Sequence, residues 1–269
     1  MLCSVEWGYT RHVKPIVLLS FFALILPVWA GPDRVGYEKD DQRTFVEIER
    51  HKRSYFISGE PNTKAQLSIK IPVKQGSGHY LGYSQRLIWE LFTESSSPVT
   101  DVNFNPEYFY RITRTDNGIW RGIDFGAEHL SNGGEEPKSR SWNSVYAYLP
   151  FELQLGEGNV YLSVKTFALF AMDEENKDAR DYLGWYEFEF ATRDFFRNIL
   201  SYDELYVAVR PGGREGGRFT HGSLEVGARF KVFRGKTAPH AFLQYFTGHG
   251  ESQLTYKQKT HALRIGLSL

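Results

Sequence analysis

Apolar and polar residues alternate along most of the chain beyond residue 53, in segments separated by Gly, Asn, Asp and Pro. Successive side chains of an extended strand point to opposite faces, so a period of two predicts strands with one apolar face. We find no helical period of 3.6 between these segments. We predict twelve strands, at about 54–58, 64–73, 79–92, 104–114, 119–131, 140–154, 159–172, 181–193, 199–210, 218–233, 239–248 and 258–269.

The two faces of these predicted strands differ in chemistry. The stretch 185–191 alternates aromatic residues with Glu187 and Glu189, and the segment 258–269 has an apolar residue at every second position up to Leu269. A membrane barrel with an acidic lumen explains this pattern, and an apolar C-terminal strand is typical of outer-membrane barrels. A soluble barrel reverses the two faces, and periodicity alone does not separate the two classes.

Composition is compatible with a membrane barrel and excludes some partners. Mean hydropathy is −0.42 and aromatic residues make up 16% of the chain. Strands that expose apolar residues only at alternate positions give a low mean hydropathy, and the aromatic girdles of a barrel raise the Phe, Tyr and Trp count. Net charge is zero with no long basic run, which argues against nucleic acid as a partner.

The N-terminus has the features of a secretory signal peptide. Basic residues that include Arg11 and Lys14 precede the apolar run 16–29, and Val28-Trp-Ala30 fits a small-x-small cleavage site. An uncleaved anchor is the alternative, but the run is short for a membrane span and contains a proline. We therefore expect residues 1–30 to be removed during export.

The remainder, 31–269, shows no internal repeat and no second domain, and we predict one barrel domain. Its first part, 31–53, is rich in charge, and we interpret it as a solvated extension before the first strand. The only cysteine, Cys3, lies in the signal, so the exported chain has no disulfide and no cysteine metal site.

Three polar residues in the middle of the chain suggest hydrolytic chemistry. His129 and Ser131 are two apart, so on a strand they share a face, and Asn143 begins the next predicted strand. This is the arrangement of a nucleophile, its base and an amide that orients the base. All three extend the apolar, lipid-directed rows of their strands. On spacing alone, ordinary polar residues at a barrel rim remain the more common explanation.

The turn between these strands offers further groups. The backbone N–H groups around Gly133 could bind an oxyanion. Carbonyl oxygens, the Ser139 hydroxyl and the carboxylates of Glu135 or Glu136 are the hard ligands that calcium prefers.

The central motif resembles a known family. The pattern His129-x-Ser131-Asn-Gly133, followed by Pro137-x-Ser139-Arg-Ser-Trp-Asn143, is similar to the active-site segment of the bacterial outer membrane phospholipase A family. Other shared pieces occur in order: Tyr83-Ser-Gln85, Trp89-Glu-Leu, Ser95-Ser-Ser-Pro98, Asn103-Phe-Asn-Pro106, Tyr182-Leu-Gly-Trp185 and Gly248-x-Gly-Glu-Ser252.

This resemblance implies an all-β protein, a twelve-stranded antiparallel transmembrane β-barrel of the Gram-negative outer membrane. It further implies hydrolysis of the acyl esters of phospholipids at both positions (types A1 and A2), and of lysophospholipids, by a calcium-dependent homodimer. By position, Ser131 matches the nucleophile, His129 the general base, Asn143 the residue that orients it, and Gly133 the oxyanion donor.

The family resemblance also implies a metal site and a dimer contact. Calcium would be held by the Gly134 carbonyl, the Ser139 hydroxyl and the Ser96 carbonyl of the other subunit. A second calcium site would have Glu136 and Glu175 where relatives carry aspartates. Gln85 matches a polar residue of the dimer interface.

Two other functions compete with the lipase. A channel or structural barrel without catalysis would suit the acidic lumen, but it makes no demand on the shared face of His129, Ser131 and Asn143. A soluble lipid-binding barrel fits the C-terminal strand poorly.

Overall fold

We describe a computed structural model of the chain. The described residues are 47–92, 96–114, 118–156, 158–172, 174–193, 202–213, 221–233 and 238–269, and residues 45–269 form one compact unit. The predicted signal peptide, 1–30, lies outside the described residues and stays a prediction.

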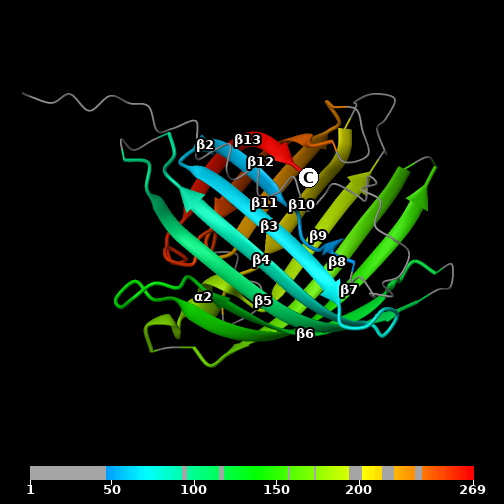
Figure 1. The fold of residues 1–269 in the computed structure, drawn as a ribbon, viewed down its shortest axis with the longest axis horizontal. Helices are drawn as coiled ribbons and strands as arrows, with labels where there is room; N and C mark the ends of the chain where they lie inside the picture. The colour runs from blue at the N-terminus through cyan, green and yellow to red at the C-terminus, as the bar shows by residue number, and fades with distance from the viewer. Residues whose placement is uncertain are drawn as a thin grey trace, which may run out of the picture. The chain divides into compact units, whose positions relative to one another are not determined.

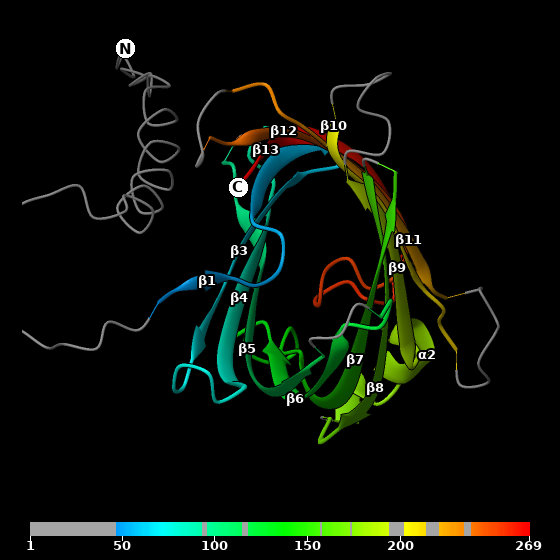
Figure 2. The ribbon, with the colours of Figure 1, turned by 90° about the vertical axis from the view of Figure 1, so that its right-hand side faces the viewer.

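Twelve antiparallel strands close into a barrel, as the alternation predicted (Figures 1 and 2). Each strand pairs with its neighbours along the chain, and β13 pairs with β2 to close the ring. The strands are β2 (Tyr55–Glu60), β3 (Thr63–Pro72), β4 (His79–Trp89), β5 (Val99–Thr113), β6 (Gly122–Ser131), β7 (Ser141–Leu155), β8 (Gly158–Phe170), β9 (Tyr186–Arg193), β10 (Tyr202–Arg210), β11 (Ser223–Phe230), β12 (His240–Gly248) and β13 (Thr260–Ser268). None of the helices in the described part of the chain has the length and hydrophobicity of a membrane-spanning helix.

The exterior of the barrel is apolar and its interior is charged. Outward-facing Phe125, Leu263 and Ile265 are between 50% and 64% exposed, whereas Arg264 is 1% exposed and Glu107 is 5% exposed. A soluble barrel would bury the apolar row instead. The faces therefore have the polarity that a lipid bilayer requires, with hydrocarbon outside and ion pairs within.

The first strand of the ring is interrupted. A two-residue strand, β1 (Glu49–Arg50), pairs with Ile69 and Lys70 of β3, and β2 pairs with residues 64–66 of the same strand. Both pieces thus lie on one edge of β3, with residues 51–54 between them.

This interruption corrects the interpretation of 31–53 as a solvated extension, which is wrong for its last residues. Lys52 Nζ lies 2.7 Å from a carboxylate oxygen of Glu107, and Arg53 donates hydrogen bonds of 2.8 Å to both carboxylate oxygens of Glu189. The acidic lumen binds these cations, so this part of the charged run lies inside the barrel. Sequence pattern alone did not show this, because the partners are more than 50 residues away.

The predicted strand 181–193 is also wrong over its first residues. A 3₁₀ turn, η2 (Glu174–Asn176), and a short helix, α2 (Ala179–Leu183), precede β9. Ala179 and Leu183 are four apart and both buried, against a cluster that includes Trp142 and Tyr256. The helix ends at Gly184, whose φ of 68° favours glycine.

Candidate active site

The hairpin of β6 and β7 positions the predicted catalytic residues. The register pairs His129 directly with Asn143, and Ser131 with Ser141. Nδ1 of His129 lies 3.0 Å from Oδ1 of Asn143, at hydrogen-bonding distance. The period of two along β6 places His129 and Ser131 on the same face as Phe125 and Ala127, which are exposed. The structure thus brings all three residues to one patch of the exterior.

The Ser131 hydroxyl has no hydrogen-bond partner among the described residues, so it is not joined to the His129 ring here. Residues two apart on a strand have Cα atoms roughly 6.6 Å apart. The Ser and His side chains can span that distance by rotating toward each other. Catalytic hydrogen bonds often tighten only when substrate binds.

The carboxamide of Asn143 is oriented by a strained neighbour. Its Nδ2 donates to the carbonyl of Ala171 at 3.5 Å, which turns Oδ1 toward His129. Ala171 follows β8 with φ of 47°, a left-handed conformation that costs energy for an alanine. Since Oδ1 can only accept, His129 Nδ1 carries the proton and Nε2 is the basic nitrogen. This tautomer is assigned from the hydrogen-bond geometry.

A proline lies opposite the histidine on the other side of β6. The register that pairs Phe104 with Ser131 and Glu107 with Glu128 places Pro106 opposite His129. Proline has no N–H, so it cannot complete the ladder there. The His129 carbonyl instead accepts a 3.0 Å hydrogen bond from Nδ2 of Asn105. The backbone of the histidine is therefore held from the lumen side.

The side chain of Asn132 shapes the turn after Ser131. Its Oδ1 accepts the backbone N–H groups of Gly134 at 3.1 Å and Arg140 at 2.9 Å, and its Nδ2 donates to the Lys138 carbonyl at 2.8 Å. Gly133 lies within this clamp with φ of 61°. Its N–H makes no hydrogen bond to any described residue, so it is free for a ligand.

The predicted oxygen ligands for calcium lie at the same end of the barrel. Within the described part of the chain, neither the Gly134 carbonyl nor the Ser139 hydroxyl has a hydrogen-bond partner. Ser96 is exposed in the connection between β4 and β5. Glu136 and Glu175 are exposed too, but the described residues hold no cluster of three or more His, Cys, Asp or Glu side chains around a common point.

Gln85 lies on the outer face in line with the predicted nucleophile. The registers align Gln85 of β4 with Phe104 of β5, and Phe104 with Ser131 of β6. Adjacent strands are about 4.8 Å apart, so Gln85 is roughly 10 Å from Ser131 across the sheet. A glutamine is unusual among lipid-facing residues because its amide needs a partner there.

An apolar cluster supports the site from inside. Trp142 faces the lumen beside Asn143, and Leu130 faces it between His129 and Ser131. Trp142 packs edge-on against Tyr256 with ring centroids 5.7 Å apart, and Leu130 packs against the same cluster. The strand segments that carry the three predicted catalytic side chains thus pack against an apolar cluster on the lumen side.

Sequence reasoning missed several supporting residues. The Asn132-Gly133 pair is a turn signal that could have shown the clamp, and Pro106 in a predicted strand could have shown the gap in the ladder. No sequence signal points to Ala171 or Tyr256, because their roles depend on contacts between distant segments.

Comparisons with known proteins agree with this architecture. The family model described as phospholipase A1 matches residues 34–269. A phospholipase A1 from Proteus vulgaris is 27% identical over 221 residues, covering 79% of this chain and 71% of that protein. The phospholipase A1 of Escherichia coli K12 is 26% identical, covering 77% of this chain and 68% of the relative.

Solved structures match the fold. The outer membrane phospholipase A of Escherichia coli superposes with a TM-score of 0.67 and 23% identity, covering 82% of this chain and 98% of that chain. A Salmonella typhi outer membrane phospholipase, described as a dimer with bound calcium, gives a TM-score of 0.68 and 22% identity. The match covers 86% of this chain and 94% of that chain.

The family match extends over most of the sequence, and the fold is a closed barrel with a lipid-compatible exterior. The predictions of a phospholipase and of a Gram-negative outer-membrane location are confirmed. The chain belongs to the phospholipase A1 family of outer-membrane enzymes.

Proposed function

We propose that the chain hydrolyses phospholipid acyl esters with Ser131 as nucleophile, His129 as general base and Asn143 as the residue that orients the base. The observation that carries this proposal is the 3.0 Å contact between His129 Nδ1 and Asn143 Oδ1 on the face that also carries Ser131. An uncharged amide suffices for this role, because it has only to accept the N–H and fix the tautomer.

The chemistry follows from this geometry. His129 Nε2 removes the proton of the Ser131 hydroxyl while its oxygen attacks the ester carbonyl. The protonated imidazole then gives the proton to the leaving alcohol, and an acyl enzyme remains. Water attacks that acyl group in a second step, with His129 again as base, which releases the fatty acid and restores the serine.

The position of the site determines how substrate reaches it. The three side chains lie on the exterior, at the end of the apolar rows of β6 and β7. Polar groups facing hydrocarbon are costly unless they bond to one another, so a location at the rim is favourable. A phospholipid ester then reaches Ser131 by lateral movement in the membrane.

The oxyanion of each tetrahedral intermediate needs a donor, and Gly133 is the candidate. Its N–H lies two residues after the nucleophile and is free of other described partners. The Asn132 clamp occupies the neighbouring Gly134 N–H and fixes the turn. One preorganised donor of this kind contributes about 10²–10³ in rate.

The residues present fit a calcium ion. The Gly134 carbonyl and Ser139 hydroxyl are hard oxygen donors without described partners, and the bound calcium in the Salmonella typhi relative supports the assignment. Two protein oxygens are too few for calcium, so waters and the partner subunit's Ser96 would supply others. When bound, the ion would contribute positive charge near the oxyanion. The second site at Glu136 and Glu175 would likewise need ligands beyond those two carboxylates.

We propose a homodimer as the active form. The relative solved as a dimer supports this, and Gln85 offers a polar contact on the apolar exterior in line with Ser131. In the monomer, Oε1 of Gln85 accepts a 3.4 Å hydrogen bond from the Tyr83 hydroxyl, and its N–H donors would gain a partner when two barrels meet. Such a dimer would also bring Ser96 of the partner subunit to the metal.

The decisive experiment compares two serines that face each other across the hairpin. Ser131→Ala should abolish release of fatty acid from phosphatidylethanolamine vesicles, whereas Ser141→Ala, the matched control, should retain it. Heat-modifiable migration in a gel checks that both barrels fold. Hydrolysis that survives in Ser131→Ala would contradict the assignment of Ser131 as nucleophile and favour a barrel without this catalytic site.

A further inference from the structure

The barrel interior contains two cavities in series. The larger, of about 540 Å³, is lined by residues near the start of β2 and the end of β13, such as Arg53 and Leu269. The smaller, of about 210 Å³, lies beneath the connection between β12 and β13. Their linings share Lys52, Gln66, Arg86, Lys165, Glu187 and Arg210. Since these six residues line both cavities, the two cavities adjoin.

The connection between β12 and β13 folds into this lumen at the end that carries the predicted catalytic residues. We name residues 249–256 the plug segment. Loops usually lie on the surface, but here Glu251, Gln253 and Tyr256 are at most 4% exposed. Figure 2 shows the segment, in orange-red, folded inside the ring of strands.

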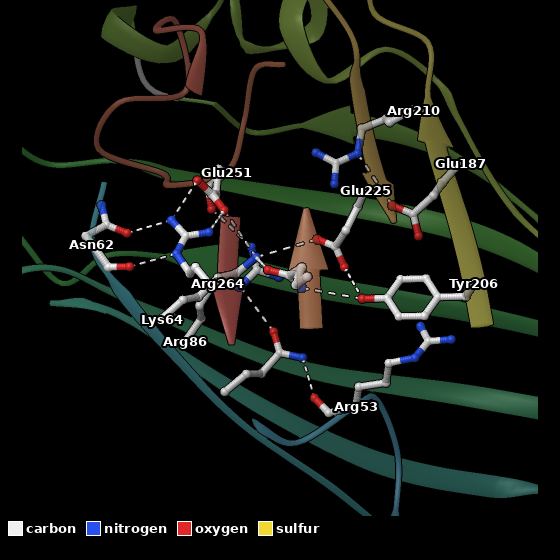
Figure 3. A network of polar contacts seen from close by, with 12 residues as sticks. Arg53, Asn62, Lys64, Arg86, Glu187, Tyr206, Arg210, Glu225, Glu251 and Arg264 are labelled. Atoms are coloured by element: carbon white, nitrogen blue, oxygen red, sulfur yellow. Dashed lines mark hydrogen bonds and ion pairs between the residues drawn. The ribbon is translucent and has the colours of Figure 1, made fainter. Parts of the chain in front are cut away.

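Charge holds the plug segment in place. Glu251 receives hydrogen bonds of 2.6 and 3.2 Å from Arg264 of β13, and Lys64 Nζ of β3 lies 3.5 Å away (Figure 3). All three side chains are at most 3% exposed. A second anchor is Asp101, which accepts hydrogen bonds from Ser252 Oγ at 2.5 Å and Leu254 N at 3.1 Å.

The smaller cavity has an unused buried donor. Neither atom of the Gln253 side-chain amide has a hydrogen-bond partner among the described residues, although the residue is only 3% exposed. Buried polar groups are nearly always satisfied, so such an amide indicates solvent or an ion in the adjoining space. The cavity that Gln253 lines is therefore polar and hydrated.

The lining favours negative ions. The larger cavity has ten Arg and Lys residues against six Asp and Glu. At the junction, Arg210 pairs with Glu187 at 3.4 Å, but Arg86 donates only to the neutral oxygens of Gln66 and of the Glu251 backbone. Within the described chain, Arg86 has no carboxylate within 4.0 Å. Glu187, Glu225 and Glu251 act on Arg86 only from beyond 4.0 Å, and the excess of cations over carboxylates in the larger cavity attracts anions.

We propose that the barrel interior is a closed passage for small inorganic anions, gated by the plug segment. Glu251 holds the plug segment closed, since its removal leaves the buried Arg264 without its carboxylate partner and Lys64 with Glu225 alone. Arg86 and Gln253 lie along the path and supply donors to the passing ion. This passage does not depend on the catalytic proposal.

Planar bilayers with a potassium chloride gradient test the proposal, with chloride as the probe. Glu251→Gln should raise the mean conductance at least tenfold over the unaltered protein, and its reversal potential should show anion preference. Adding Arg86→Gln should keep the conductance and reduce that preference. The matched control is Glu174→Gln, whose side chain is 84% exposed in η2, and it should stay closed.

Asp101→Ala gives a second route to the same state if Glu251→Gln does not fold. It releases Ser252 and Leu254 while leaving the Glu251 pairs intact, and it should also open the lumen. The proposal is overturned if folded barrels with these substitutions conduct no more than the unaltered protein, or if the opened barrel prefers cations.

Discussion

At the scale of single residues, the site depends on which atoms hold the imidazole. Sequence pattern predicted the shared face of His129 and Ser131, because strand geometry alone determines it. It could not predict the support from Ala171, which follows β8, and from Asn105 of β5. The roles of the triad remain predictions that kinetics must test.

The orienting residue should matter less than the base. We expect Asn143→Ala to lower kcat on the order of 100-fold, and His129→Ala to lower it further, because a misaligned base retains some function. Hydrolysis of a chromogenic thioester in detergent measures both. Equal losses in the two variants would contradict the separation of roles.

Asn143→Asp and Asn143→Leu test the same contact through its acceptor atom. Aspartate keeps an oxygen that accepts the His129 Nδ1–H, so we expect hydrolysis to be retained, whereas leucine has a similar size but no acceptor and should lower kcat as far as Asn143→Ala does. Hydrolysis of the same thioester measures both. A leucine variant as active as the aspartate variant would show that residue 143 does not contact the base.

Asn132 should act through the turn that it clamps. Asn132→Ala removes three hydrogen bonds around Gly133, and we expect kcat to fall about tenfold with little change in KM, since a loosened oxyanion donor binds the transition state less well. Asn132→Asp keeps the acceptor and should recover part of the rate. A change confined to KM would argue for a role in substrate binding instead.

At the scale of elements, the β6–β7 hairpin is stiffened from both sides. The alternation predicted both strands, but it missed α2, because a five-residue helix is too short to show a period. That helix and the plug segment contribute Leu183 and Tyr256 to the apolar cluster on the lumen side of the predicted catalytic residues.

Substitutions of Tyr256 test how much this apolar cluster contributes to stability. We expect Tyr256→Ala to cost about 3 kcal/mol of unfolding free energy, since it empties a site that is 1% exposed, and to lower activity as well. Tyr256→Phe removes only the hydroxyl, which donates to Asp178 and to the Glu175 carbonyl, and should cost about 1 kcal/mol. Urea unfolding in detergent measures both, and similar losses would show that the hydroxyl dominates rather than the packing.

At the scale of the whole molecule, the barrel separates two environments. The twelve strands were predictable, because lipid and lumen impose opposite polarity on alternate residues. The entry of Lys52 and Arg53 into the lumen was not, because a charge run carries no information about distant carboxylates. Assembly and metal binding also belong to this scale.

Calcium removal should stop turnover. We expect EDTA to reduce the rate of fatty-acid release to background and added calcium to restore it, since the oxyanion then lacks one source of positive charge. A rate that is indifferent to EDTA would refute the metal role.

Gln85→Leu should weaken the dimer and raise the protein concentration needed for half-maximal activity.

The catalytic assignment is tested most directly by covalent labelling with a long-chain sulfonyl fluoride, read by peptide mass spectrometry. An activated serine attacks this reagent, so the label should appear on Ser131, be absent from Ser131→Ala and form far more slowly in His129→Ala. Label on another serine, or equal labelling with and without His129, would contradict it.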